Sequence, residues 1–204
     1  MPDPACPYVS RGGLKLAAAL EAFTLDVTGR TCADLGCSTG GFTDCLLQRG
    51  AARVFAVDTG YGQLAWKLRQ DPRVTVMERT NALHAEPVEP CDVVVLDLGW
   101  TKQALAIPAA LRWLTAAEHG RIVSLVKPHY ESGRHTLTDD EADAVTQDVL
   151  ATQMPSLGVT VLTVIRSPLR GGKGGNLEHL ALLARTAPRA AAPAAHDGGA
   201  AAQP

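Results

Sequence analysis

The sequence predicts an α/β protein with a seven-stranded, mostly parallel sheet. Two observations predict it: short β-branched runs alternate with helical patterns from residue 31 to residue 163, and a glycine-rich turn follows the first run. Such alternation is typical of βαβ units, in which helices cover both faces of a parallel sheet. The 204 residues, 46% of them hydrophobic, are enough for one such domain and too few for two ordinary ones.

Seven strands and five helices account for the alternation. The expected strands cover residues 31–35, 53–57, 74–77, 92–96, 121–126, 160–165 and 177–183, and the expected helices cover 14–23, 41–48, 63–70, 108–118 and 139–153. The last strand is expected to run antiparallel to its neighbours. In the first helix Leu16, Leu20 and Phe23 recur at helical spacing and should face the core. Lys15 then lies off this apolar stripe and is free for chemistry.

The chain is expected to hold one domain, residues 8–186, between an N-terminal extension (1–7) and a tail (187–204). The tail is nearly all Ala, Pro and Gly, has little to bury, and is expected to be disordered. No stretch approaches the roughly 18 uninterrupted apolar residues of a membrane helix. The first residues carry prolines but no apolar signal core, so we expect a cytoplasmic protein with no membrane partner.

The cysteines predict neither a metal site nor a redox role. There are five, and none forms a Cys-x-x-Cys pair: Cys6, Cys32, Cys37, Cys45 and Cys91. They lie in or beside apolar segments, so we expect buried thiols rather than disulfides or zinc ligands.

The charge balance does not by itself indicate nucleic-acid binding. The formal net charge is -2, whereas duplex binders usually carry a basic excess. An RNA partner would therefore need local positive charge. Two segments supply it, residues 10–15 and 166–173, although a solvated loop is the plainer interpretation of either one alone.

A glycine-rich turn, residues 33–42, lies where the first strand passes into a helix, the place at which doubly wound sheets bind ligands. Ser38 replaces the second glycine of a dinucleotide-binding turn, and Asp34 puts an acidic group at the strand end. Both features favour a cationic ligand without phosphate, hence S-adenosylmethionine over a nicotinamide cofactor. The turn residues expected to bind it are Asp34, Gly36, Ser38, Thr39, Gly40, Gly41 and Phe42.

A second acidic residue, Asp58, ends the next strand. Its distance from the glycine turn is close to the offset of about 20 residues at which a carboxylate meets ribose hydroxyls. Thr59 and Gly60 follow it and can turn the chain over an adenosine, while Asn81 is placed to read the adenine edge. The alternatives are that Asp34 and Asp58 cap helices and that Asn81 is an ordinary turn residue.

Four polar residues are expected to meet at one cleft. Asp97 and Lys127 follow the fourth and fifth expected strands, Glu178 interrupts the last, and Lys15 lies on the first helix. The carboxyl ends of parallel strands share one sheet edge, which also places Asp97 beside the cofactor. A ribose hydroxyl must be oriented and deprotonated, and a lysine can do both if a second lysine and burial lower its pKa. We therefore expect Lys127 to orient or deprotonate the hydroxyl, with the other three residues supporting it. For each residue taken alone, a surface salt bridge or a strand-end charge is the alternative.

Several segments together resemble one family. They are residues 8–16, 35–47, 57–64, 78–81 and 125–128. These segments are similar to the TlyA-type rRNA methyltransferases, a family also labelled haemolysin A and related to the FtsJ-like 2′-O-methyltransferases. The likeness runs over residues 8–183, and residues 1–7 do not match the S4 RNA-binding domain that usually precedes it.

The resemblance implies a Rossmann-like S-adenosylmethionine-dependent methyltransferase fold and ribose 2′-O-methylation of ribosomal RNA. It also implies a Lys-Asp-Lys-Glu tetrad, which falls on Lys15, Asp97, Lys127 and Glu178. After Asp97 the family tends to read Ser-Phe-Ile-Ser, whereas this chain has Leu-Gly-Trp-Thr. For Trp100 a packing role is expected ahead of stacking on a flipped base. The residues expected to contact RNA are Arg11, Arg166, Arg170 and Lys173.

Three other functions compete with this one. A methyltransferase for a small molecule or a protein suits the acidic charge balance but not the complete tetrad. A cofactor-binding module without catalysis would be expected to lose a tetrad lysine, and none is lost. A cytolysin needs amphipathic or spanning segments, which this sequence lacks.

Overall fold

The computed structural model describes residues 6–172 and 174–186, and every structural statement here refers to these. The expected tail (187–204), most of the expected N-terminal extension and the predicted RNA contact Lys173 lie outside the described residues. No helix in the described part of the chain is long and apolar enough to span a membrane.

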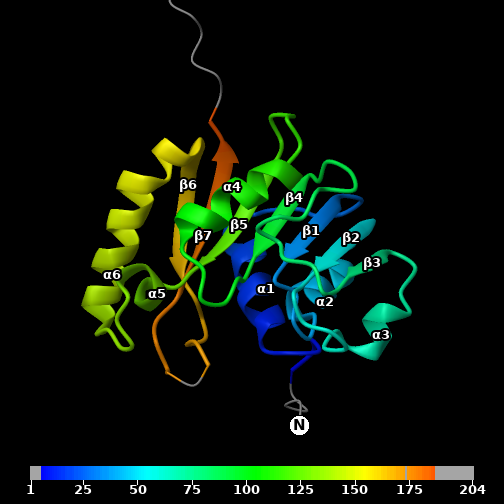
Figure 1. Cartoon of the computed structure of the whole chain (residues 1–204), viewed down its shortest axis with the longest axis horizontal. Helices are drawn as coiled ribbons and strands as arrows, with labels where there is room; N and C mark the ends of the chain where they lie inside the picture. Colours follow the sequence, from blue (N-terminus) through cyan, green and yellow to red (C-terminus); the bar gives the residue numbers. More distant parts are fainter. Residues whose placement is uncertain (1–5, 173, 187–204) are drawn as a thin grey trace, which may run out of the picture.

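A seven-stranded sheet forms the centre of the molecule, in the order β3-β2-β1-β4-β5-β7-β6 (Figure 1). Its strands are β1 (Thr31–Leu35), β2 (Arg53–Val57), β3 (Val74–Met77), β4 (Val93–Leu96), β5 (Arg121–Val126), β6 (Val159–Arg166) and β7 (His179–Arg185). The pairs among β3, β2, β1, β4 and β5 are all parallel, whereas β7 is antiparallel to both β5 and β6. The predicted Rossmann-like sheet with one antiparallel strand is confirmed.

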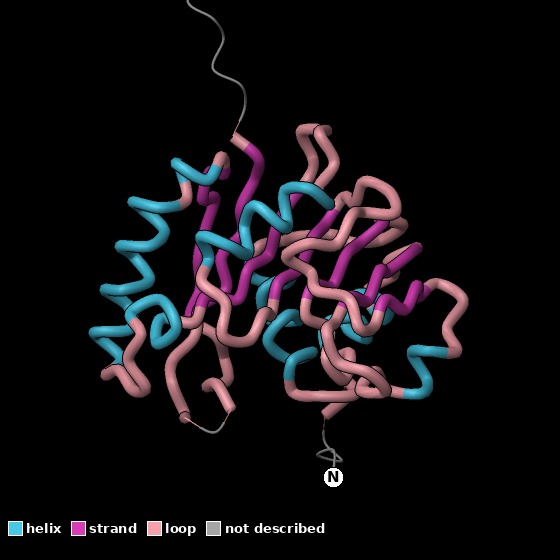
Figure 2. Tube along the Cα trace, viewed as in Figure 1, coloured by secondary structure: helices cyan, strands magenta, loops and turns pink. Residues whose placement is uncertain are grey.

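Helices cover both faces of the sheet (Figure 2). They are α1 (Gly12–Ala22), α2 (Gly41–Gln48), α3 (Trp66–Arg69), α4 (Gln103–Trp113), α5 (Pro128–Ser132), α6 (Asp139–Asp148), the π-helical turn η1 (Val149–Gln153) and the 3-10 turn η2 (Pro155–Leu157). On one face the buried apolar residues of α1 and α2 pack on the sheet, and on the other those of α4 and η1 do so. These two clusters form the core and fix the sheet edge that carries the site.

The helix expected at 108–118 is wrong at both ends, because α4 begins at Gln103 and ends at Trp113. Proline favours the first turn of a helix, yet Pro108 lies inside α4. Burial of Ile107 and Ala110 beside it offsets the one backbone hydrogen bond that proline cannot make. The start of α6 at Asp139 is confirmed, and Thr138 and Glu141 form a capping box there.

Two further differences concern short elements. The helix expected at 63–70 is shorter in the structure, where only the four residues of α3 are helical. The five-residue helix α5 was not expected, although Pro128 at its first turn is a signal for a helix start that sequence reasoning missed. This helix brings two aromatic side chains to the site, His129 and Tyr130.

Candidate active site

The carboxyl ends of the central strands gather the predicted tetrad. Asp97 directly follows β4 and Lys127 directly follows β5. Because β7 is antiparallel to β5, it begins at the same edge, and Glu178 immediately precedes it. Lys15 reaches this edge from α1. Four residues far apart in the sequence thus line one cavity.

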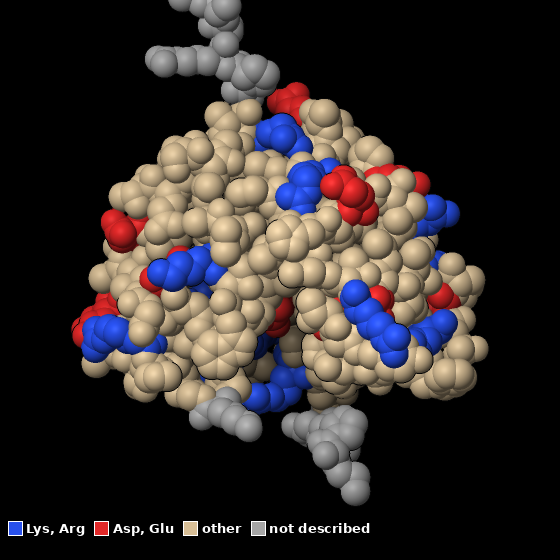
Figure 3. Space-filling model, in the orientation of Figure 1, with Lys and Arg blue, Asp and Glu red and all other residues tan. Residues whose placement is uncertain are grey.

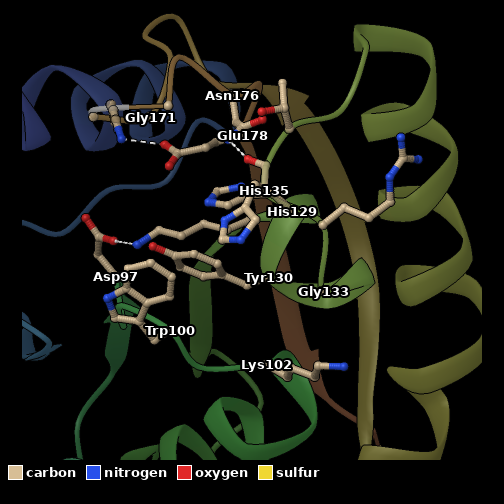
Figure 4. Close-up of a pocket in the computed structure, with 16 residues that line it drawn as sticks. Asp97, Trp100, Lys102, His129, Tyr130, Gly133, His135, Gly171, Asn176 and Glu178 are labelled. Carbon is tan, nitrogen blue, oxygen red and sulfur yellow. Dashed lines mark hydrogen bonds and ion pairs between the residues drawn. The ribbon is translucent and has the colours of Figure 1, made fainter.

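The tetrad is organised as two ion pairs (Figure 4). Lys15 Nζ lies 2.5 Å from Glu178 Oε2, and Lys127 Nζ lies 2.5 Å from Asp97 Oδ1. The first pair is nearly removed from solvent, with side chains 12% and 4% exposed. The convergence and pairing are observed, whereas the catalytic role of the four residues stays a prediction.

The pKa of Lys127 differs from the expectation. Burial is the largest influence and by itself lowers this pKa, but the charge and hydrogen bond of Asp97, together with Glu178 and Tyr130, outweigh it and leave the pKa raised. In this structure the pairing with Asp97 therefore favours the ammonium form of Lys127, which is suited to orient an oxygen atom.

Two cavities meet at the tetrad. The larger, about 840 Å³, is lined by all four tetrad residues and by side chains of α5. The smaller, about 250 Å³, lies over the glycine turn after β1. Lys15 and Asp97 line both cavities. A molecule in the smaller cavity and another in the larger one would therefore face each other across these two side chains.

Glycines in the turn are required by close backbone contacts. Gly36 has a φ of 94°, in the left-handed region, and a Cβ there would lie 2.6 Å from the carbonyl oxygen of Asp97. A Cβ on Gly41 would lie 2.8 Å from the backbone nitrogen of Gly13, where α2 touches α1. The turn thus approaches β4 on one side and α1 on the other.

Asp34 is completely buried beneath the turn. Its Oδ2 accepts hydrogen bonds from the backbone nitrogen and the hydroxyl of Thr43, at 2.9 and 2.6 Å. Its Oδ1 is buried without a hydrogen-bond partner. Burial raises the pKa of Asp34 to about 7, the Thr43 hydrogen bonds oppose this, and the charges of Asp97 and Asp58 add to it. An unpartnered carboxylate oxygen with these properties favours a hydrogen-bond donor or a cation nearby.

Asp58 ties two loops together at the ends of β1 and β2. Its Oδ2 accepts from the backbone nitrogen of Ser38 at 2.8 Å, and its Oδ1 accepts from that of Gly60 at 2.7 Å. The carboxylate therefore holds the glycine turn in place.

The residues expected to bind the cofactor divide into two groups. Seven of them line the smaller cavity: Asp34, Gly36, Ser38, Thr39, Gly41, Phe42 and Asp97. The other five do not line it: Gly40, Asp58, Thr59, Gly60 and Asn81. The side chain of Asn81 accepts from the backbone nitrogen of Leu83 at 2.9 Å, which is the turn role given as its alternative.

The predicted RNA contacts are less available than expected. Arg166 pairs with Asp143, and Arg170 pairs with Asp139 at 2.7 Å, both carboxylates being on α6. Each guanidinium is thus held in an ion pair, although both arginine side chains are 55% exposed, so their contact with RNA stays a prediction. Arg11 is exposed and lines the smaller cavity. Basic and acidic side chains are interspersed on the face shown in Figure 3, where they do not gather into one basic patch.

The expected packing role of Trp100 is wrong. Its side chain is 83% exposed, and the residue has a positive φ of 57°. Its ring stacks on that of Tyr130, with centroids 4.9 Å apart, and both line the larger cavity (Figure 4). His129 and His135 line the same cavity and were also missed. The cavity that holds the tetrad thus has an aromatic wall.

Comparison with known proteins agrees with this geometry. The family model described as FtsJ-like methyltransferase matches residues 8–167. The chain belongs to the FtsJ-like methyltransferase family. It is therefore a methyltransferase, and its family is S-adenosylmethionine-dependent.

Three relatives illustrate the likeness. The chain is 44% identical to the 16S/23S rRNA (cytidine-2′-O)-methyltransferase TlyA of Mycobacterium tuberculosis over 192 residues, 90% of this chain and 70% of that protein. It is 36% identical to Hemolysin A of Brachyspira hyodysenteriae, over 85% of this chain and 75% of that one. A candidate hemolysin of Streptococcus thermophilus has a similar structure, with a TM-score of 0.81 and 41% identity over 89% of this chain and 68% of that one.

Proposed function

We propose that this FtsJ-like enzyme transfers a methyl group from S-adenosylmethionine to the 2′-hydroxyl of a ribose in ribosomal RNA. One observation carries the proposal: the two cavities meet at Lys15 and Asp97, within a Lys-Asp-Lys-Glu tetrad. The named activity of the similar Mycobacterium tuberculosis protein supports the choice of ribose and of ribosomal RNA. A ribosomal substrate would place the enzyme in the cytoplasm.

The smaller cavity fits S-adenosylmethionine in its chemistry. Its glycine turn packs directly against the end of β4, because a Cβ on Gly36 would lie 2.6 Å from the carbonyl oxygen of Asp97, and both residues line this cavity. The buried, unpartnered oxygen of Asp34 beneath it suits a positively charged amino acid moiety better than a phosphate. When bound, S-adenosylmethionine supplies a methyl group already activated by a sulfonium.

The residues of the larger cavity orient the hydroxyl. The ammonium of Lys127 donates a hydrogen bond to the ribose oxygen, and Asp97 holds this ammonium in place. Lys15 and Glu178 form the second pair at the junction and balance the charge. Trp100 and Tyr130 offer an aromatic surface for the base of the same nucleotide.

The proposal is tested by mapping 2′-O-methyl groups in ribosomal RNA from cells with and without the gene. We expect a ribose methyl group to disappear on deletion and to return with the wild-type gene but not with Lys127→Ala. An unchanged map, with methyl transfer by the purified enzyme to a protein or a small molecule instead, would contradict the RNA assignment.

Replacing Asp58 should weaken cofactor binding although this residue does not line the cavity. Asp58→Ala removes two hydrogen bonds that hold Ser38 and Gly60, and bonds to charged groups contribute about 1.5–3 kcal/mol each. We therefore expect S-adenosylmethionine affinity, measured by calorimetry, to fall about tenfold or more. Asp26→Ala is the control, because Asp26 accepts a similar hydrogen bond from the backbone nitrogen of Thr28 in the exposed loop between α1 and β1. Equal affinities in both variants would contradict the prediction.

Removing the exposed ring of Trp100 should lower activity on RNA without changing the affinity for the cofactor. Stacking of a base on an aromatic side chain contributes about 1–3 kcal/mol, so Trp100→Ala should lower kcat/KM on ribosomal subunits about 5- to 150-fold. Cofactor affinity should not change, because Trp100 lines only the larger cavity. The control is Trp66→Ala, a tryptophan 73% exposed that lines neither cavity. An equal loss in both variants would show that Trp100 has no special role.

A further inference from the structure

Three arginines flank the larger cavity on the side of β6. Arg134 lines the cavity itself. Arg170 directly precedes Gly171, which also lines it, and Arg166 is the last residue of β6. The three arginine side chains are 55% or 56% exposed, so a solute can reach each of them. Exposed guanidinium groups are well suited to bind the phosphates of a nucleic acid.

All three arginines are paired with carboxylates of one helix, α6, which lies beside β6 at the end of the sheet (Figure 1). The pairs are Arg134–Glu141 and Arg170–Asp139, both at 2.7 Å, and Arg166–Asp143. Two nitrogens of Arg170 donate to the two oxygens of Asp139, at 2.9 and 2.7 Å. A guanidinium uses the same two-point geometry on a phosphate. The carboxylates of α6 therefore bind these arginines as phosphates would.

The stability of α6 alone does not account for this pattern. Acidic residues in a first turn stabilise a helix through its dipole, and Asp139, Asp140 and Glu141 all occupy that turn. Asp140 serves this purpose without an ion pair to any described residue. Asp143 lies beyond the first turn and is nevertheless paired. The three paired carboxylates thus share a contact with an arginine on one flank of the cavity rather than a position in the helix.

We propose that the α6 carboxylates take the place of RNA phosphates on this flank and that ribosomal RNA must displace them to bind there. This inference rests on the proposed function. Exposed ion pairs contribute little to stability, so each arginine can exchange its carboxylate for a phosphate. The competition favours an RNA that offers phosphates to several arginines at once. In a chain of net charge -2 it limits attachment to RNA in general.

The exchange predicts a weak dependence of RNA binding on salt. An unpaired arginine that binds a phosphate contributes about 0.7 to 0.9 to the slope of log affinity against log salt concentration, because a counterion leaves the RNA. When the arginine must first leave a carboxylate, that carboxylate takes up a cation, and the release and the uptake nearly cancel. Freeing an arginine from its carboxylate should therefore both tighten RNA binding and steepen its salt dependence.

The test measures binding to ribosomal subunits from cells that lack the gene, between about 50 and 200 mM salt. At the lower salt concentration Asp139→Asn, which frees Arg170, should bind about 1.5- to 5-fold more tightly than wild type. Adding Glu141→Gln frees Arg134 and should bring the gain to about 2- to 30-fold, with a slope steeper by up to about 1.4 to 1.8. Glutamine at position 141 keeps the capping-box acceptor, so α6 should remain folded.

Asp140→Asn is the matched control, because it removes the same charge from the same turn and frees no arginine. It should leave the salt slope unchanged. Asp143 is left intact in these variants, since its Oδ1 also lies 2.7 Å from Nε2 of the buried His179.

A second comparison links the gain to one arginine. In an Arg170→Gln background, Asp139→Asn should give no tighter binding than Asp140→Asn does, because no guanidinium remains to be freed. Equal affinities and slopes for Asp139→Asn and Asp140→Asn in the otherwise wild-type chain would overturn the inference, while methylation of the subunits by wild type would leave the proposed function standing. A wild type that neither binds nor methylates ribosomal subunits would overturn the proposed function and this inference with it.

Discussion

Lys127→Ala should reduce methyl transfer to ribosomal subunits by at least about 10³-fold, because the ammonium that orients the hydroxyl is lost where geometry controls the rate. The affinity for S-adenosylmethionine should stay within about threefold of wild type, since an interaction made mainly in the transition state does not affect binding of the donor. Lys127 lines the larger cavity and not the smaller one, which is the structural basis for this separation.

Lys102→Ala is the matched control. Lys102 lines the same cavity but is exposed and forms no ion pair among the described residues. Its kcat should stay within about threefold of wild type. Near-normal turnover by Lys127→Ala would refute the assignment of the tetrad, and a parallel loss of cofactor affinity would indicate a structural role instead.

Glu178→Gln should have the largest effect on stability. It removes one member of a pair whose side chains are 12% and 4% exposed, and it leaves the Lys15 ammonium buried without its counterion. Breaking a buried pair in this way costs about 3–5 kcal/mol of unfolding free energy. Urea unfolding followed by circular dichroism measures the change directly.

Two comparisons separate this effect from a general loss of surface charge. Asp139→Asn breaks the exposed pair with Arg170, whose side chains are 40% and 55% exposed, and should change stability by less than about 1 kcal/mol. Combining Lys15→Met with Glu178→Leu removes both charges and should recover most of the lost stability without recovering activity. Equal destabilisation by Glu178→Gln and Asp139→Asn would contradict the buried-pair argument.

The sheet was predictable because its strands are short apolar runs separated by clear turn signals. The bounds of β1, β2, β3 and β5 match the prediction, and the antiparallel direction of the last strand is confirmed, although β7 covers His179–Arg185 rather than 177–183. The start of α4 was not predictable from local preference, because tertiary burial of Ile107 and Ala110 overrides the tendency of Pro108 to begin a helix.

The positions of Asp97 and Lys127 followed from one rule, that residues after parallel strands meet at one edge, whereas those of Glu178 and Lys15 depended on the antiparallel β7 and on α1. The electrostatics of the tetrad could not be predicted from the sequence. The raised pKa of Lys127 depends on a distance of 2.5 Å to Asp97 that no spacing in the sequence reveals. The occupation of Arg166 and Arg170 by carboxylates likewise depends on how α6 packs beside β6. Trp100 was assigned to packing because sequence alone does not distinguish a buried ring from an exposed one, and the structure leaves it 83% exposed.

The contact between Gly41 and Gly13 gives the site its alignment. Lys15 belongs to the first turn of α1, two residues after Gly13, while the glycine turn that leads into α2 frames the smaller cavity. The two backbones approach closely there, with the Ser10 hydroxyl beside them: a Cβ on Gly41 would lie 2.2 Å from Ser10 Oγ and 2.8 Å from the Gly13 nitrogen. The first turn of α1 and the glycine turn are therefore packed directly against each other, which fixes how the two cavities are aligned. We expect a single methyl group added at position 41 to push the two helices apart and to disturb both cavities at once, without altering any charged group.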